Sequence, residues 1–270
     1  MTEPQYVFLI GAARSGTKFL RDTLSVSDDV AQVPYDINYV WRHGNENCPH
    51  DELQPDDISE KAAAHIRLSI KRLALKDTKR SPKIILEKTV SNTLRVEAVR
   101  RVFPDAQFVY LERNGADAVE SSYRQWTMPA DRQYLIEKLR YFPLREWRYG
   151  LWFAKNLAAR SEGPPIWGPR YKGISRDTAT LSVPEVCATQ WLRSVLLARE
   201  SCRGPGTHTI RYEQLSDPEA GLAQLTGLLG LSDAERVLGH FNKTFNKTTT
   251  WPGAIPPGDR RAVEKIIELA

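Results

Sequence analysis

The chain has 270 residues, of which 41% are hydrophobic and 26% are charged. This composition is that of an ordinary globular protein, and it excludes the disordered, collagen-like and disulfide-scaffold classes. The chain has 38 Lys and Arg residues against 33 Asp and Glu residues, so its net charge is only +5. That mild excess suits a small anionic ligand and is too small to indicate a nucleic-acid partner.

The N-terminal residues and the cysteines favour a location in the cytoplasm. The apolar run Tyr6–Ile10 is far shorter than the roughly 20 residues that a membrane-spanning helix needs. The Met1–Pro4 leader has no basic residues of the kind that open a signal peptide. The cysteines at 48, 187 and 202 are odd in number and widely spaced, which disfavours a disulfide framework. We therefore expect a cytoplasmic protein with no transmembrane segment, and the oligomeric state stays open.

Short apolar runs alternate with helical patterns along the chain. Strands are predicted at Tyr6–Ile10, Lys83–Glu87, Gln107–Leu111 and Thr207–Tyr212. Helices are predicted from Gly16, from Ser91 or Asn92 to Phe103, from Gly115 to Trp126, at Pro143–Ala159, at Val183–Cys202 and from Asp217. This alternation predicts an α/β fold in which helices cover both faces of a parallel sheet, with a helical, loop-rich insertion in the middle of the chain.

The segment Gly11–Lys18 is the most informative one. It lies between a predicted buried strand and a predicted helix, where backbone N–H groups and the helix dipole favour a bound phosphate or sulfate. The segment resembles a Walker A loop, but Thr17 and Lys18 stand in the reverse of the usual Lys-Ser/Thr order. An ammonium group there would repel magnesium, so the loop suits a phosphate held without a metal ion.

Basic residues also follow two other predicted strands. Lys88 follows the predicted strand Lys83–Glu87, and Arg113 lies just after the predicted strand Gln107–Leu111, which places both at the carboxyl edge of the sheet. Ser121 lies eight residues after Arg113, less than two turns into the next predicted helix. We therefore expect Arg14, Lys18, Lys88 and Arg113 to converge on one pocket, with Ser121 facing it.

Taken together, these motifs resemble those of sulfotransferases that use 3′-phosphoadenosine 5′-phosphosulfate. Gly11–Thr17 resembles the family's 5′-phosphosulfate loop, and Val109–Gly115 with Ser121 resembles its 3′-phosphate motif. Glu87–Thr89 is similar to the Glu-Lys-Thr segment of heparan-type carbohydrate sulfotransferases, and Arg211–Glu213 to a strand end common in the superfamily. The resemblance covers roughly residues 6–125 and 207–216.

The resemblance implies a role for each of these positions. The 5′-phosphosulfate would lie on Arg14, Ser15, Gly16, Thr17 and Lys18, and the 3′-phosphate on Arg113 and Ser121. Lys88, together with Arg14, would stand beside the transferring sulfuryl group, and Lys247 would fall in a loop near the nucleotide. The product would be adenosine 3′,5′-bisphosphate, and no metal site is implied.

The general base is expected after a short second strand. In glycan sulfotransferases a carboxylate follows the phosphate loop at this place, and Val30–Asp36 fits it, which makes Asp36 the first choice. His43, His50 and Glu87 stay as alternatives. His43, Cys48 and His50 also suggest zinc, but no fourth ligand stands at a usual spacing.

The acceptor side is assigned to the middle of the chain. We expect one domain over 1–270, with 1–125 and 207–270 as the nucleotide-binding core and 126–206 as a helical acceptor-side region. Four residues are the candidates for acceptor binding, with the aromatic rings placed in loops where they would stack on sugars: Trp41, His43, Trp167 and Arg170.

The predicted function is transfer of sulfate to a hydroxyl group, on a carbohydrate or glycoconjugate, by in-line displacement without a metal. Two rival functions are a P-loop small-molecule kinase and a non-catalytic protein that binds anionic glycans. A kinase would need a Lys-Ser/Thr pair after Gly16, which this sequence lacks. A non-catalytic glycan-binding protein would give no reason for four residues to stand at these positions along the chain: Arg14, Lys88, Arg113 and Ser121.

Overall fold

The computed structural model describes all residues except 1–2, 77, 79–80, 129–165, 218 and 246–252. Within these residues the central sheet has five strands in the order β2-β3-β1-β4-β5. All four strand pairings are parallel. The strands are β1 (Gln5–Ile10), β2 (Val30–Gln32), β3 (Ile84–Glu87), β4 (Gln107–Glu112) and β5 (Thr207–Arg211). The predicted α/β fold with a parallel sheet is confirmed.

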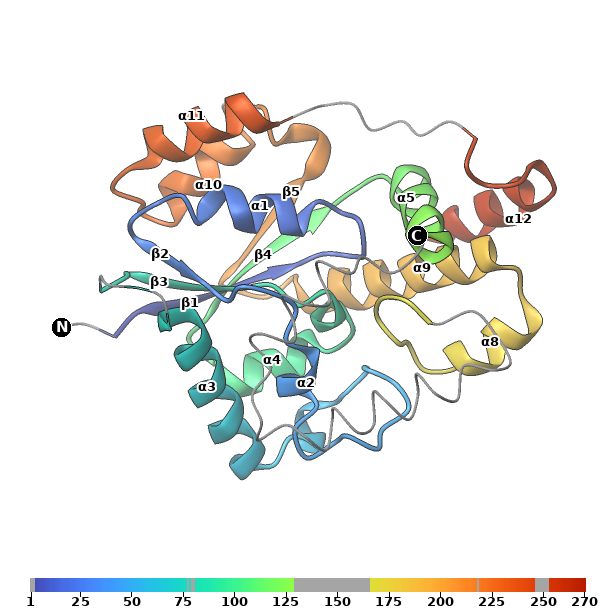
Figure 1. The fold of residues 1–270 in the computed structure, drawn as a ribbon, viewed down its shortest axis with the longest axis horizontal. Coiled ribbons are helices and arrows are strands. Elements are labelled where there is room, and N and C mark those ends of the chain that lie inside the picture. Colours follow the sequence, from blue (N-terminus) through green and yellow to red (C-terminus); the bar gives the residue numbers. More distant parts are fainter. Residues whose placement is uncertain (1–2, 77, 79–80, 129–165, 218, 246–252) are drawn as a thin grey trace.

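Helices cover both faces of the sheet because alternate residues of each strand are apolar on opposite sides (Figure 1). Val7 and Leu9 of β1 pack in one core cluster with residues of α1 (Thr17–Leu24), α10 (Leu222–Leu228) and α11 (Ala234–Thr244). Phe8 and Ile10 pack in a second cluster, on the other face. That cluster includes residues of α2 (Asn38–Trp41), α3 (Glu60–Leu75) and α4 (Val96–Val102).

A third group of helices packs together around a core of its own (Figure 1). It consists of α5 (Gly115–Thr127), α8 (Ile174–Thr180), α9 (Val183–Ser201) and α12 (Pro257–Ile267). Their shared core includes Trp126 and Trp191, which are both nearly buried. The predicted helix Pro143–Ala159 lies outside the described residues.

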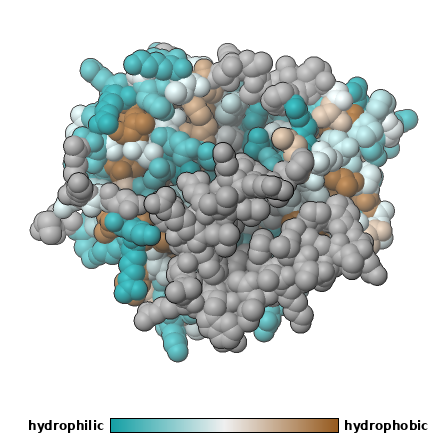
Figure 2. Space-filling view, in the orientation of Figure 1, coloured by the Kyte–Doolittle hydropathy of each residue, from teal (hydrophilic) through white to brown (hydrophobic). Residues whose placement is uncertain are grey.

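Figure 2 shows hydrophobic residues in small separate patches among hydrophilic ones on the viewed face. None of the helices described in the structure is both long enough and apolar enough to cross a bilayer.

Two predicted helix starts differ from the structure. Neither Ser91 nor Asn92 caps α4, because both lie in a short 3-10 helix, Val90–Leu94, and α4 begins after Arg95. Asn92 is engaged elsewhere: its Nδ2 donates to Glu87 Oε2 at 2.9 Å. The helix predicted from Asp217 begins only at Leu222, because the Asp217 side chain accepts from the Glu219 amide and closes a local turn.

A buried carboxylate, that of Asp51, connects the loop before α8 to α2. Asp51 accepts from Arg42 Nη1 at 2.9 Å, from Asn38 Nδ2 at 3.0 Å and from the Arg170 amide at 2.9 Å. The Asp51 amide in turn donates to the Arg170 carbonyl at 2.6 Å. Burial acts to raise the pKa of Asp51, but Arg95, the Arg170 amide and Arg42 together hold that pKa below its usual value. The carboxylate is therefore an anchor for the residues that follow the insertion.

Candidate functional site

The loop between β1 and α1 has the geometry of an anion-binding turn. Gly16 caps α1 in the left-handed conformation, with φ +90°, and no side chain caps the helix. The first amides of the helix are thus left for a ligand or water. Arg14 also has a positive φ, of 67°, which costs a non-glycine residue on the order of 1–2 kcal/mol. Such strain is typical of functional loops.

Two glycines allow this loop to sit close to its neighbours. A Cβ atom at Gly11 would lie 2.8 Å from the Leu111 carbonyl oxygen of β4. A Cβ atom at Gly16 would lie 2.6 Å from the Tyr212 ring, in addition to the strain of its left-handed conformation. Only glycine fits at either position, so the loop is packed directly against the ends of β4 and β5.

Arg14 comes together with Arg113 and Ser121, although these two residues lie about 100 positions further along the chain. Arg14 Nε donates to Ser121 Oγ at 2.9 Å, and Arg113 Nη1 donates to the Arg14 carbonyl at 2.8 Å. The pKa of Arg14 is lowered, first by desolvation and then by repulsion from Arg113. An anion placed between the two guanidinium groups would relieve that repulsion.

Buried donors at this cluster have no acceptor among the residues that the structure describes. They are Arg113 Nε, Arg113 Nη2 and Ser15 Oγ. Arg113 and Ser15 are both buried. A buried donor without an acceptor costs about 1–3 kcal/mol, and more when the group is charged. Oxygen atoms of a phosphate or sulfate group would satisfy these donors, so the residues present fit an anionic ligand.

Lys88 and Asp36 form the second part of the site. Lys88 Nζ lies 2.5 Å from Asp36 Oδ1, with the Lys88 side chain 7% exposed and the Asp36 side chain 28% exposed. Lys88 follows β3 and Arg113 follows β4, on opposite sides of β1. Two strand spacings separate β3 from β4, about 10 Å. The two parts of the site therefore flank the Gly11–Gly16 loop at the carboxyl edge of the sheet.

Glu87 lies beneath this pair and is fully buried. Its Oε1 accepts from Thr89 Oγ1 at 2.5 Å and from Trp41 Nε1 at 3.5 Å, and its Oε2 accepts from Asn92 Nδ2 at 2.9 Å. Burial, and next in the same direction the negative charge of Asp36, raise the pKa of Glu87 to about 7. A carboxyl group buried to this degree is not accessible to an acceptor hydroxyl, which disfavours Glu87 as the general base.

The raised pKa of Glu87 predicts that stability falls as the pH rises. The folded protein holds a proton on Glu87 up to about pH 7, whereas the unfolded chain releases it near pH 4.5. The resulting stability is fully present below about pH 4.5 and is lost as the pH rises through 7. We expect Glu87 to make the free energy of unfolding fall by about 3 kcal/mol between pH 4.5 and pH 8.

Urea unfolding at several pH values measures this effect. Glu87→Gln keeps an acceptor oxygen but cannot ionise. The free energy of unfolding of this variant should therefore not show the fall that Glu87 causes between pH 4.5 and pH 8. Glu97→Gln, at a side chain 52% exposed on α4, controls for the loss of one carboxylate and should follow the wild type. Identical pH dependence in Glu87→Gln and the wild type would contradict the assignment.

Lys18 is not brought to the cluster. Its side chain is 71% exposed and pairs with Asp22, four residues further along α1, at 3.2 Å. The expected convergence of four basic residues is therefore wrong for Lys18, because the helix turns this side chain outward. Thr17, the residue before it, is buried at the start of α1. Lys247 lies outside the described residues.

The predicted acceptor-binding residues fall into two groups. Trp41 does not lie in a loop: it is in α2, fully buried, with its ring against Phe8 and Phe103. The expectation of an open face for sugar stacking is thus wrong for Trp41. His43, half-buried after α2, stacks on His65 with ring centroids 3.7 Å apart.

Trp167 and Arg170 do lie in a loop, the one before α8, and both are half-buried. The Trp167 carbonyl accepts from Gln190 Nε2 at 2.9 Å, and the Arg170 backbone pairs with Asp51. The structure thus fixes the path of this loop against α9 and the Asp51 anchor.

Tyr212 belongs to the site, although the sequence indicated no role for its side chain. The guanidinium carbon of Arg113 lies 4.4 Å from the Tyr212 ring centroid, which is a cation–π contact. The same ring packs against Gly16. The motif Arg211–Glu213 marked this strand end, but only the fold places its aromatic ring under Arg113.

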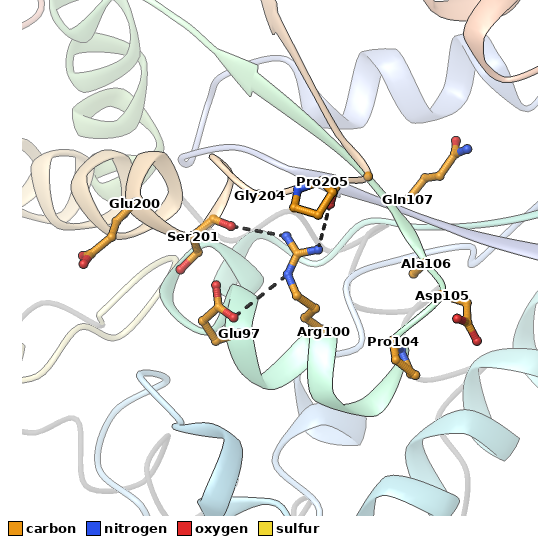
Figure 3. Close-up of a pocket in the computed structure, with 11 residues that line it drawn as sticks. Glu97, Arg100, Pro104, Asp105, Ala106, Gln107, Glu200, Ser201, Gly204 and Pro205 are labelled. Carbon is orange, nitrogen blue, oxygen red and sulfur yellow. Dashed lines mark hydrogen bonds and ion pairs between the residues drawn. The ribbon is translucent and has the colours of Figure 1, made fainter.

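A surface hollow elsewhere is not part of this site. It lies between α4, the end of α9 and the amino ends of β4 and β5, at the edge of the sheet opposite the Gly11–Gly16 loop (Figure 3). Its arginine, Arg100, already donates to the Ser201 and Pro205 carbonyls, each at 3.3 Å.

Among the described residues, no cluster of three or more His, Cys, Asp or Glu side chains is arranged to hold a metal ion.

The comparisons with solved structures identify the fold. Among solved structures, a sulfotransferase from Alicyclobacillus acidocaldarius superposes with a TM-score of 0.51 at 18% identity, covering 100% of this chain and 93% of its own. The sulfotransferase domain from the curacin biosynthetic pathway gives 0.50 at 16% identity, covering 98% of each chain. Sulfotransferase STF9 from Mycobacterium avium gives 0.51 at 10% identity, covering 100% of this chain and 76% of its own. At these identities the likeness is one of fold.

Sequence comparison gives the family. A search of curated proteins found no match. The model of the sulfotransferase family matches residues 4–166, which include the Gly11–Gly16 loop, Asp36, Lys88, Arg113 and Ser121. More than half of the chain is matched, and the fold agrees with that of solved sulfotransferases. The chain therefore belongs to the sulfotransferase family.

Proposed function

We propose that this sulfotransferase takes the sulfuryl group from 3′-phosphoadenosine 5′-phosphosulfate and transfers it to a hydroxyl group of a carbohydrate or glycoconjugate. The observation that carries the nucleotide assignment is the set of buried donors at Arg113 and Ser15, which have no acceptor in the described residues. These hydrogen-bond donors lie beside a strained loop at the start of a helix, and an anion with several oxygen atoms would satisfy them.

Two groups of donors around the phosphate loop suit the two ends of such a nucleotide. Arg113, held in place by Tyr212 and the Arg14 carbonyl, would take the 3′-phosphate together with Ser121. Ser15, Gly16, Thr17 and the amides of α1 would take the 5′-phosphosulfate. Lys18, which is turned outward, would reach the nucleotide only after leaving Asp22.

Lys88 and Asp36 would serve the transfer itself. Sulfuryl transfer between oxygens is an in-line displacement, in which the protein chiefly positions groups and balances charge. Lys88, with Arg14, would stabilise the negative charge that grows on the bridging oxygen as its bond to sulfur breaks. The Asp36 carboxylate would accept the proton of the attacking hydroxyl, since it is partly exposed and already lies against Lys88.

The acceptor would bind over residues 126–206, as a region added to the nucleotide-binding core. The loop before α8 belongs to that region, and it is held by Asp51 and Gln190. Trp167 and Arg170 offer an aromatic ring and a cation in this loop, a combination that suits an anionic sugar. The Glu-Lys-Thr segment, similar to that of carbohydrate sulfotransferases, favours the same class of acceptor.

Calorimetry with adenosine 3′,5′-bisphosphate tests the nucleotide assignment. We expect binding that is unchanged by EDTA and at least tenfold tighter than that of adenosine 5′-monophosphate. Because hydrogen bonds to charged groups contribute about 1.5–3 kcal/mol, Arg113→Ala should weaken the bisphosphate by about 10- to 100-fold. It should leave the monophosphate nearly unchanged.

Arg236→Ala, which removes a guanidinium 57% exposed on α11, is the matched control and should bind as the wild type does. A preference for ATP with magnesium would favour the kinase alternative instead. A panel of hydroxylated sugars, lipids and phenols with labelled donor then tests the acceptor class.

A further inference from the structure

The end of β3 and the turn that carries Asp36 are joined by more than the Lys88–Asp36 pair. The Ile37 amide donates to Thr89 Oγ1 at 3.0 Å, and that hydroxyl donates in turn to Glu87 Oε1 at 2.5 Å. Ile37 is the residue directly after Asp36. Three consecutive residues, Glu87, Lys88 and Thr89, therefore act on the same turn.

We propose that Thr89 is a positioning residue that holds the Asp36 carboxylate in place against Lys88. This inference rests on the proposed function, in which Asp36 is the general base. Thr89 is itself too deeply buried to touch a substrate, with 1% of its surface exposed. Its effect on the reaction must pass through the Asp36–Ile37 peptide.

The direction of the two hydrogen bonds gives Thr89 a specific geometry. A hydroxyl has one proton and two lone pairs, and here the hydroxyl donates to the Glu87 carboxyl oxygen while one of its lone pairs accepts from the Ile37 amide. Glu87 thereby orients the hydroxyl, with Asn92 Nδ2 on its other oxygen at 2.9 Å. The Ile37 amide thus meets an acceptor whose orientation is already set.

The other end of the turn is held from α1. Arg21 Nη1 donates to the Pro34 carbonyl at 3.0 Å, and the Arg21 side chain is buried. The turn is thus fixed at both ends, from the helix after the phosphate loop and from the end of β3. Thr89 acts at the end adjacent to Asp36. Misplacement of a reacting group by about 1 Å can lower a rate by about 100-fold, so this contact bears directly on turnover.

The experiment compares hydroxyl-free and hydroxyl-bearing variants. Thr89→Val should lower kcat by about tenfold, and leave the Kd of adenosine 3′,5′-bisphosphate within about twofold of the wild type. Thr89→Ala is a second hydroxyl-free variant, should the valine variant not fold. Thr89→Ser keeps the hydroxyl and should restore most of the activity. Thr93→Val removes a nearby buried hydroxyl, which donates to the Val90 carbonyl at 2.9 Å, and should retain wild-type kcat.

A double-mutant cycle with Asp36→Asn separates positioning from general damage. If Thr89 acts through Asp36, Thr89→Val should lower the residual kcat of Asp36→Asn by less than about twofold. A full tenfold loss in that background would overturn the proposal, as would a wild-type kcat in Thr89→Val or a failure of Thr89→Ser to restore activity.

Hydrogen exchange at the Ile37 amide tests the contact without relying on catalysis. Exchange should be at least tenfold faster in Thr89→Val than in Thr89→Ser or Thr93→Val, and equal rates would overturn the proposal. If the wild type transfers no sulfuryl group to any acceptor, the proposed function is overturned, and the exchange rates alone then decide whether Thr89 holds the turn.

Discussion

Lys88→Ala is expected to lower kcat for sulfuryl transfer by about 10²- to 10³-fold. Lys88 is buried at the end of β3 and is the cation that faces Asp36, so no solvent molecule replaces its charge at low energetic cost. The nucleotide would be held chiefly by Arg113, Ser15 and the amides of α1. We therefore expect the Kd of adenosine 3′,5′-bisphosphate to change by less than about threefold, a split that single-turnover rates and calorimetry measure.

Lys83→Ala is the matched control for this prediction. Lys83 lies just before β3, its side chain is 60% exposed, and it pairs with Asp29 at 3.0 Å. Its replacement removes one lysine from the same part of the chain, at the opposite end of the strand, and should leave kcat within about twofold of the wild type. A Lys88→Ala variant that keeps wild-type turnover with saturating donor and acceptor would remove Lys88 from the mechanism.

Asp36→Asn is expected to act on turnover and on donor binding in opposite directions. Loss of the general base should lower kcat by about 10²- to 10⁴-fold. At the same time Lys88 Nζ loses its carboxylate partner, which lies at 2.5 Å in the wild type. The anionic sulfuryl donor then no longer binds beside the negative charge of Asp36. Removal of roughly 1 kcal/mol of repulsion should tighten donor binding by about fivefold.

Rapid-quench turnover and calorimetry on the same preparation measure the two effects together. Asp28→Asn, at an aspartate 51% exposed and paired with Arg236, controls for the loss of a carboxylate and should change neither quantity. Weaker donor binding in Asp36→Asn would mean that the pair with Lys88 helps to build the donor site. Unchanged turnover would show that another group accepts the proton.

The strands and the phosphate loop were predictable because their signals are local. Continuous apolar runs such as Tyr6–Ile10 are typical of buried parallel strands, and the glycines of the following loop mark a tight turn. The helix Glu60–Leu75 was not predicted. Its buried face is largely alanine, with Ala62, Ala63 and Ala74 among its buried residues, which gives a weak apolar pattern.

The site was predictable only as far as strand ends determine it. Lys88 and Arg113 follow β3 and β4, so their place at the carboxyl edge follows from the parallel sheet. The position of Trp41 depends instead on contacts with Phe8 and Phe103, which come from distant parts of the chain. The contact of Tyr212 with Arg113 likewise depends on β5 pairing with β4 across about 100 residues of sequence.

The Asp51 anchor has a consequence for how acceptor preference can change. Asp51 binds the loop before α8 through the main-chain amide and carbonyl of Arg170, which every residue type except proline can supply. The residue at position 170 can therefore be exchanged for any type except proline while the contact with Asp51 is kept. A library randomised at Trp167 and Arg170, with Asp51 retained, is thus a natural starting point for directed evolution toward new acceptors.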